Sequence, residues 1–246
     1  MPHDLKDKVA IVTNVTGFVG LPAATALAGA GALALCHDPS FSNEPACRAF
    51  AEAHPGLGAL QLDDPGATVE AVVAAEGRLD VLVLNDVFPA KRAPVEDVDP
   101  DDFRAALEAL AVAPMRWASA AVPVMKAQGA GSIVFVTSAA PLRGIPNYSM
   151  YAAARGAANA LTVSLAKELA PAGIRVNAVA PNFVESPTYF PEDLLADPQK
   201  RAKIESNIPL GRLGKPEEVG ELIAFLAGAD AGFMTGQVVP VAGGWA

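Results

Sequence analysis

VTNVTGFVG, residues 12–20, follows directly on a strand-like apolar run at 9–13 and leads into a helical stretch. A strand that passes through a tight loop into a helix is the opening unit of a doubly wound α/β sheet. Such a loop normally carries three glycines, which let a dinucleotide pyrophosphate approach the backbone. Here Asn14 and Phe18 occupy two of the glycine positions, and Gly20 remains. The stretch therefore predicts the fold and leaves open what the loop binds.

The same strand-and-helix rhythm continues along the whole chain. Several of the strand-like runs are apolar throughout, which is typical of a parallel sheet covered on both faces. We expect an α/β protein with a single Rossmann-like domain over residues 1–246 and a doubly wound parallel sheet of about seven strands. The predicted strands are 9–13, 32–36, 57–62, 81–84, 132–137, 175–180 and 238–241, and the predicted helices are 19–30, 43–53, 66–76, 101–128, 149–170 and 216–228.

Composition and charge exclude several classes of protein. The net charge is −9, and no basic cluster exceeds two residues, so nucleic acid is not expected as a partner. The two cysteines, Cys36 and Cys47, imply neither a disulfide framework nor a metal site, and no metal is expected. The chain has no apolar signal region and no apolar run long enough to span a membrane, so we expect a soluble cytoplasmic protein.

One segment, residues 181–209, departs from the rhythm. It contains five prolines and the aromatic pair Tyr189–Phe190, and it follows a predicted strand directly. Ligands of open α/β sheets bind beyond the carboxyl ends of the strands. We therefore predict that this insertion forms a lid or a pocket wall rather than an irregular surface loop.

Three residues can carry chemistry together. Ser138 ends a predicted strand, Tyr151 begins a predicted helix thirteen residues later, and Arg155 lies one helical turn beyond Tyr151. A nearby guanidinium favours the phenolate form of a tyrosine, so Tyr151 could accept a proton from a hydroxyl while Ser138 holds the same oxygen. An isolated Tyr–Arg pair would more often be a packed aromatic beside a solvated cation. The serine at a strand end in this fold favours the catalytic interpretation.

These residues resemble the short-chain dehydrogenase/reductase superfamily over nearly the whole chain. The resemblance rests on the opening loop, Leu84–Asn85, Ser138 with Tyr151, the run 176–181, and the closing glycines of 235–244. In that superfamily a lysine stands where Arg155 stands here, an asparagine where Leu110 stands, and a glycine where Asn182 stands. The departures therefore concentrate on the groups that bind the nicotinamide cofactor, while Ser138 and Tyr151 remain.

The altered pattern resembles the halohydrin dehalogenases, the cofactor-independent branch of the same superfamily. Their two motifs match Thr13-x4-Phe18-x-Gly20 and Ser138-x12-Tyr151-x3-Arg155. The resemblance implies that no cofactor is used. It implies that Tyr151 takes the hydroxyl proton of a vicinal haloalcohol, that Ser138 orients the oxygen, and that Arg155 lowers the pKa of Tyr151. Halide then leaves as an epoxide forms, and in reverse halide, azide, cyanide or nitrite opens an epoxide.

The resemblance also implies where the ligands bind. The halide would lie where nicotinamide lies in the parent superfamily, against Phe18 and the loop Pro181, Asn182, Phe183 and Val184. The backbone N–H groups of Phe183 and Val184 would form a nest for the anion. Pro89, Leu142, Ile145 and Tyr189 are the predicted lining of the substrate pocket. A homotetramer is implied through the helices at 101–128 and 149–170, and Trp245 could pack at an interface.

Two other functions remain open at this stage. The first is a nicotinamide-dependent oxidoreductase, because Asp38 follows the second strand, where such enzymes hold the adenosine ribose. The second is a non-catalytic scaffold with the same fold. The first predicts NAD(P)H binding, and the second predicts that no activity depends on Tyr151.

Overall fold

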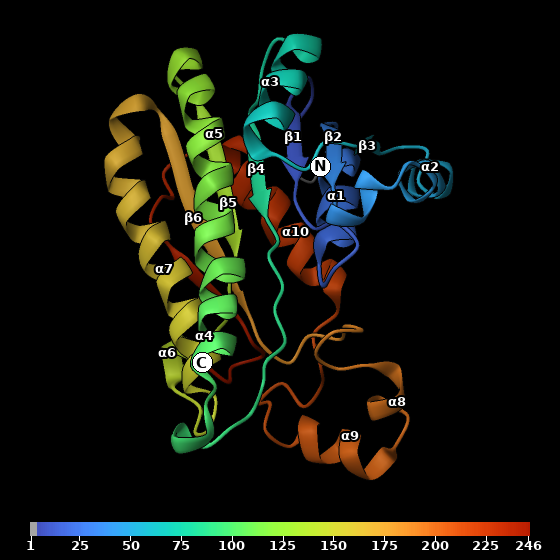
Figure 1. The fold of residues 1–246 in the computed structure, drawn as a ribbon, viewed down its shortest axis with the longest axis vertical. Helices are drawn as coiled ribbons and strands as arrows, with labels where there is room; N and C mark the ends of the chain where they lie inside the picture. The colour runs from blue at the N-terminus through green and yellow to red at the C-terminus, as the bar shows by residue number, and fades with distance from the viewer. Residues whose placement is uncertain (1–3) are drawn as a thin grey trace.

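A computed structural model describes residues 4–246 of the protein (Figure 1). Seven strands form one parallel sheet in the order β3-β2-β1-β4-β5-β6-β7, so the chain winds outward from β1 to one edge, returns, and continues from β4 to the other edge. The predicted α/β class, parallel sheet and strand number are confirmed. The strands are β1 (Val9–Val12), β2 (Leu33–His37), β3 (Gly58–Leu60), β4 (Val81–Leu84), β5 (Gly131–Val136), β6 (Ile174–Pro181) and β7 (Val238–Val241).

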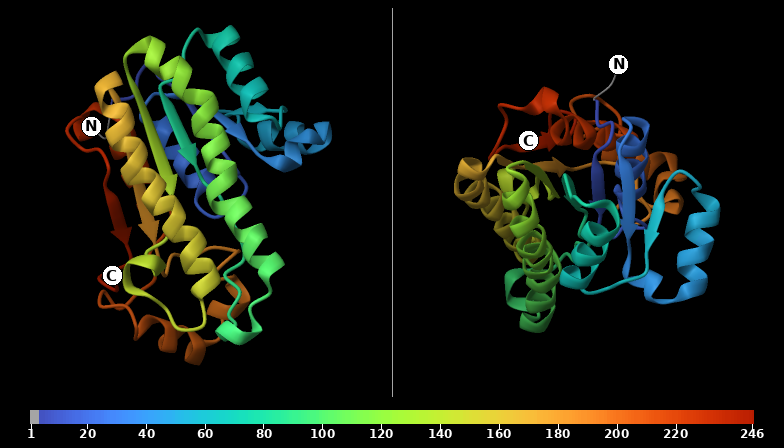
Figure 2. Two further views of the ribbon diagram at one scale, coloured as in Figure 1. Left: turned by 60° about the vertical axis from the view of Figure 1, so that its left-hand side comes forward. Right: turned by 90° about the horizontal axis from the view of Figure 1, so that it is seen from above.

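Helices cover both faces of this sheet, as the view from above shows (Figure 2). The helices α1 and α10 pack against each other on one face, and α3, α5 and α7 lie on the other. The helices are α1 (Gly20–Gly29), α2 (Glu44–Ala53), α3 (Pro65–Glu76), α4 (Pro100–Leu107), α5 (Ala113–Gln128), α6 (Ala140–Arg143), α7 (Ser149–Leu169), α8 (Glu192–Leu195), α9 (Pro198–Glu205) and α10 (Pro216–Ala227).

The uniformly apolar strands are explained by this double cover. Successive side chains of a strand point to opposite faces of the sheet. In β1, Val12 packs with Leu27 of α1, and Ile11 packs in the cluster on the other face, which contains Trp117 of α5. Because both faces are dry, every residue of β1 is buried, and an alternating polar pattern would leave polar groups without water.

The predicted helix at 101–128 is interrupted by a π-helical turn, Glu108–Val112, between α4 and α5. Pro114 lacks an N–H and therefore cannot donate to the carbonyl of Leu110 four residues earlier. The backbone widens at this place, and the side chain of Leu110 is buried in the cluster beside Tyr151. Apolar periodicity predicted the helix but could not show the break, because the buried face continues through it.

The insertion at 181–209 lies beyond the carboxyl ends of the strands, as predicted, and it contains α8 and α9 (Figure 1). Neither helix was predicted. The side chains of α9 are all at least partly exposed, so α9 carries no apolar stripe to reveal it. Its one local signal is Asp197, which caps the N–H groups of Gln199 and Lys200. Among residues 4–246, no helix has the length and apolar character needed to cross a membrane.

Candidate active site

The buried side chain of Arg155 is the centre of the polar cluster at the carboxyl end of the sheet. Its Nε donates to the Tyr151 hydroxyl at 3.1 Å, and its Nη2 donates to the Tyr189 hydroxyl at 3.1 Å. Nη1 and Nη2 also donate to the carbonyls of Val136 and Asp86, each at 3.0 Å. The planar guanidinium thus joins α7, the ends of β5 and β4, and the insertion. These four bonds compensate a cation that is only 1% exposed.

The local structure of α7 explains why Tyr151 and Arg155 meet. Residues four apart on a helix lie on the same face, one turn above the other. That face points to the sheet, so both side chains are buried. Burial by itself lowers the pKa of Arg155, but Tyr151 and Tyr189 outweigh burial and raise the pKa above its ordinary value. Arg155 therefore remains a cation next to two phenols.

The two phenols differ in their surroundings. Tyr189 donates to the carbonyl of Phe88 at 3.1 Å, and its ring lies edge-on to Phe18 with the centroids 5.2 Å apart. Burial raises the pKa of Tyr189 to about 12, and Arg155 offsets this only in part. Tyr189 is consequently held as a neutral phenol, which is a hydrogen-bonding group rather than a base at neutral pH.

Ser138 stands two residues after the end of β5, as predicted. Its hydroxyl is nearly buried and accepts a hydrogen bond from the N–H of Ala140, where α6 begins. Ala140 belongs to the same apolar cluster as Tyr151. The fold therefore brings the serine and the Tyr151–Arg155 pair to the same end of the sheet. The sequence predicted this grouping from strand ends and helix spacing.

Asp86 is a site residue that the sequence analysis missed. It follows β4 by two residues, is 5% exposed, and accepts a hydrogen bond from the Asn14 amide at 3.1 Å. Burial raises its pKa to about 7, although Arg155 and Asn14 oppose the rise. The available signal was a carboxylate shortly after a buried strand, next to the Leu84–Asn85 pair.

The loop of residues 12–20 is fastened to the residues that follow β4. Asn14 and Phe18, in the two former glycine positions, both have left-handed backbone angles, with φ of 48° and 42°. The Asn85 amide donates to the carbonyls of Asn14 and Gly17, which pins this loop to the end of β4. A Cβ on Gly20 would come within 2.6 Å of Val15, so this glycine is required by packing within the loop.

The residues predicted to bind halide lie together around this loop and the end of β6. The Phe18 ring contacts Tyr189, which belongs to the insertion. Phe183 has a left-handed backbone conformation, with φ of 55°. The predicted nest is partly occupied, because the N–H of Phe183 donates to the Asn182 side chain at 3.0 Å. An anion held by both N–H groups would have to displace that amide oxygen. Pro181 and Val184 are buried and anchor the two ends of this turn.

The predicted substrate-pocket residues separate into two groups. Ile145 and Tyr189 pack against the apolar cluster that contains Tyr151. Leu142 is 47% exposed, and Pro89 is also exposed, so neither belongs to that cluster. Phe88 takes the place expected for Pro89, because the backbone after β4 turns the phenylalanine inward. Neighbouring loop positions could not be distinguished by sequence.

Comparison with known proteins places this site in a family. A family model described as enoyl-(acyl carrier protein) reductase matches residues 17–246. The chain belongs to the short-chain dehydrogenase/reductase superfamily. Over 98% of both chains it is 36% identical to the 3-oxoacyl-[acyl-carrier-protein] reductase of Thermotoga maritima. The protein is thus a member of a superfamily of enzymes, as the sequence predicted.

Two solved structures of this superfamily are more similar to the protein. One, described as a dehalogenation enzyme, is 49% identical, with a TM-score of 0.96 over 98% of this chain and 99% of that chain. The other is halohydrin dehalogenase HheC bound to ethyl (2S)-oxiran-2-ylacetate. It is 40% identical, with a TM-score of 0.93 over 96% of each chain. The predicted resemblance to halohydrin dehalogenases is confirmed by these comparisons.

The residues of the loop do not fit the dinucleotide that many members of the superfamily bind. Asp38, in the position expected for a ribose contact, accepts four hydrogen bonds from the N–H and hydroxyl groups of Thr16 and Ser40. Burial alone would raise the pKa of Asp38, but these bonds outweigh it and hold the pKa below its ordinary value. The carboxylate is therefore already satisfied within the chain. The side chains of Asn14 and Phe18 add bulk where a pyrophosphate needs bare backbone.

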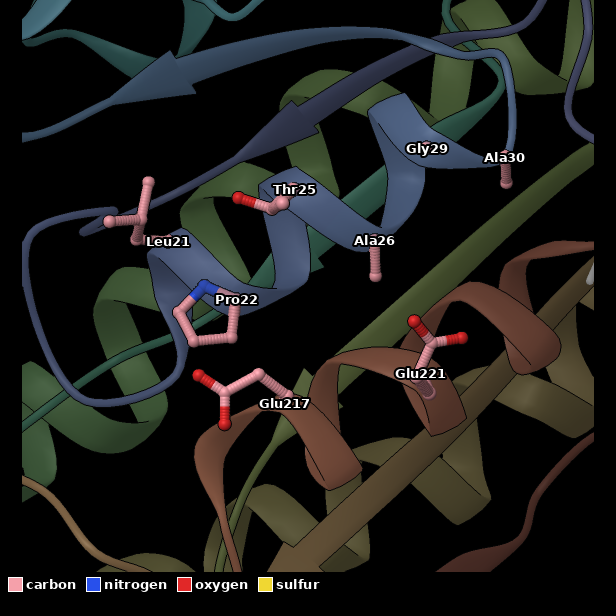
Figure 3. Close-up of a pocket in the computed structure, with 8 residues that line it drawn as sticks. All are labelled: Leu21, Pro22, Thr25, Ala26, Gly29, Ala30, Glu217 and Glu221. Carbon is pink, nitrogen blue, oxygen red and sulfur yellow. The ribbon is translucent and has the colours of Figure 1, made fainter. Parts of the chain in front are cut away.

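A hollow lies between α1 and α10, away from the polar cluster around Arg155 (Figure 3). It is lined mainly by apolar side chains of α1, with the carboxylates of Glu217 and Glu221 on the α10 side. None of its lining residues belongs to the Ser138–Tyr151–Arg155 group.

Within residues 4–246, no cluster of three or more histidine, cysteine or acidic side chains could hold a metal ion.

Proposed function

We propose that the protein converts vicinal haloalcohols to epoxides and halide without a nucleotide cofactor, and that it opens epoxides with halide, azide, cyanide or nitrite. The observation that carries the proposal is the Nε–hydroxyl bond from Arg155 to Tyr151. It is joined by a loop that has Asn14 and Phe18 in two of the expected glycine positions and is bonded to the Asn85 amide. The similarity to a dehalogenation enzyme and to an epoxide-bound halohydrin dehalogenase supports it.

In the proposed reaction, the Arg155 cation stabilises the phenolate of Tyr151. The phenolate accepts the hydroxyl proton of the haloalcohol, and Ser138 holds the same oxygen by a hydrogen bond. The oxygen forms a bond to the neighbouring carbon while the carbon–halogen bond breaks, and the halide leaves with the bonding electrons. Tyr151 then releases its proton to solvent. The products are an epoxide, a halide and a proton, which balances the reaction.

The leaving halide would lie against Phe18 and the turn at Asn182–Phe183. Aromatic edges carry partial positive charge and tolerate an anion, and their bulk removes water from it. Backbone N–H groups in a left-handed turn supply the polar contacts. The Asn182 side chain accepts a hydrogen bond from the Phe183 N–H, so halide binding would exchange one acceptor for another.

The test is halide release from 1,3-dichloro-2-propanol in the absence of any nucleotide. We expect release of halide and of protons in the wild type and near-complete loss in Tyr151→Phe. Tyr148→Phe, a neighbouring partly buried tyrosine outside the Arg155 network, is the matched control and should retain activity. Full activity in Tyr151→Phe would disprove the mechanism.

The similarity to a 3-oxoacyl-[acyl-carrier-protein] reductase favours a second candidate, a nicotinamide-dependent oxidoreductase. It predicts that NAD(P)H binds, which calorimetry measures directly. We expect no binding, because Asp38 already accepts hydrogen bonds from Thr16 and Ser40. A third outcome, in which neither halide release nor NAD(P)H binding is found, would indicate a non-catalytic scaffold.

A further inference from the structure

The turn that contains Phe183 is strained and externally supported. Its φ of 55° is uncommon for a bulky residue, and such a conformation persists only where its surroundings enforce it. Two aromatic rings flank the Phe183 ring. Phe190 of the insertion lies 5.7 Å away between centroids, and Trp245 lies 5.6 Å away in an edge-to-face arrangement. The support from Trp245 comes from the same chain.

Trp245 is itself held in place from two sides. The guanidinium of Arg143 lies 4.8 Å from the centre of the indole, and Arg143 Nη1 donates to the Trp245 carbonyl at 2.5 Å. Gly243 and Gly244 both have positive φ and turn the chain back toward the site. A Cβ on Gly243 would lie 2.6 Å from Ile208, at the end of the insertion, so this turn is closely packed.

Arg143 connects this contact to the catalytic residues. It is the last residue of the short helix α6. Ser138, which would hold the substrate oxygen, lies two residues before the start of this helix. The contacts Arg143–Trp245–Phe183 therefore run from α6, which begins beside Ser138, to the turn that would hold halide. Neither Arg143 nor Trp245 touches the Tyr151–Arg155 pair through any hydrogen bond described for residues 4–246.

We propose that Trp245 is a positioning residue of the anion site, which keeps Phe183 in its left-handed conformation, and that Arg143 holds Trp245 there. This inference rests on the proposed function for the location of the anion. It predicts that the indole of Trp245 lies close to a bound halide and that the anion affinity depends on both residues. It assigns a function to the C-terminal turn that the catalytic residues do not require.

The chain contains two tryptophans, which makes the inference measurable by fluorescence. Trp117 of α5 is 5% exposed, and its ring contacts the His37 ring. Trp117→Phe leaves Trp245 as the only indole, and Trp245→Phe leaves Trp117. We expect bromide to quench the emission of the Trp117→Phe protein along a saturating curve. The Trp245→Phe protein should show only weak quenching that is linear in bromide.

Calorimetric titration with bromide tests the positioning function separately. An aromatic pair contributes enough that Trp245→Ala should weaken bromide binding roughly two- to tenfold. Trp245→Phe should retain most of the affinity because it keeps an aromatic edge, and Arg143→Leu should weaken it in the same direction as Trp245→Ala. Arg48→Leu removes an exposed arginine on α2 and is the matched control, which should leave the affinity unchanged.

The outcomes distinguish this inference from the proposed function. Linear quenching of Trp245, or bromide affinity that is equal in the wild type, Trp245→Ala and Arg143→Leu, would overturn the inference. Saturable quenching together with a failure to release halide from haloalcohols would support the anion site and reject the dehalogenation. Halide release from haloalcohols, together with Trp245 emission that bromide does not quench along a saturating curve, would support the dehalogenation and reject the inference about Trp245.

Discussion

Arg155 and Tyr189 are joined by a 3.1 Å hydrogen bond between Nη2 and the phenol oxygen, although they are 34 residues apart. The bond ties the insertion at 181–209 to the cation that also contacts Tyr151. Since Tyr189 in turn donates to the Phe88 carbonyl, one phenol connects three parts of the site. The insertion is thus attached to the Tyr151–Arg155 pair through Tyr189.

Removal of that phenol should loosen the insertion. Tyr189→Phe leaves a buried N–H of Arg155 and the Phe88 carbonyl each without one partner, which costs about 1–3 kcal/mol of stability. Denaturant unfolding measures the loss, and we expect the KM for haloalcohol to rise because the wall of the pocket is less ordered. Tyr148→Phe is the control. Unchanged stability and KM in Tyr189→Phe would show that the bond contributes nothing.

Replacement of Arg155 by lysine should not preserve the site. A lysine ammonium is a compact charge on a flexible stem, so it cannot reach Tyr151 and the carbonyls of Val136 and Asp86 together. We expect Arg155→Lys to lose roughly 2–4 kcal/mol of stability and about 100-fold or more in halide release. NAD(P)H should still not bind, because Asn14 and Phe18 remain. An Arg155→Lys protein with wild-type halide release would contradict this prediction.

The contribution of Asp86 to the stability of the folded protein should fall as pH rises through the range in which its carboxyl group ionises. Its pKa is about 7 in the folded protein and near 3.8 when exposed, so between these values the folded state binds more protons than the unfolded state. The contribution to stability is complete below about pH 4 and is lost by about pH 7. Asp86→Asn, which mimics the protonated form, should be more stable than the wild type at pH 8 by up to roughly 4 kcal/mol.

Chemical unfolding at pH 8 and at the lowest pH that keeps the fold checks this assignment. The difference between Asp86→Asn and the wild type should shrink as the pH falls. Asp102→Asn, on an exposed carboxylate paired with Lys91, is the control and should show no such trend. A constant difference at all pH values would mean that Asp86 has an ordinary pKa.

We propose that the protein assembles as a homotetramer through α5 and α7. A hollow between these helices is lined largely by small and apolar side chains, and Met115 at its border is 38% exposed. Met115→Glu should shift the assembly toward dimers, because a carboxylate buried between subunits would lack a partner. Val95→Glu, at a position that is 78% exposed and outside this surface, is the control. Light scattering coupled to size-exclusion chromatography measures both, and an unshifted tetramer in Met115→Glu would contradict the interface.

The sequence alone determined the sheet, its two helical layers, and the pairing of Tyr151 with Arg155, and it predicted that Ser138 joins them. These features depend on relations that are local in the chain: apolar runs, strand ends, and the four-residue spacing of a helix face. The unusual loop at 12–20 could also be recognised from the sequence, because Asn14 and Phe18 occupy positions where glycines were expected.

Only the tertiary structure decided which distant groups complete the site. The bond from Arg155 to the Asp86 carbonyl spans 69 residues, and Trp245 meets Phe183 only because the C-terminal turn folds back on the insertion. Such contacts depend on the paths of loops. In a loop, two neighbouring residues can point in opposite directions, as the inward Phe88 and the exposed Pro89 show. The raised pKa of Asp86 likewise arises from burial by segments far away in sequence, so it became visible once the chain was folded.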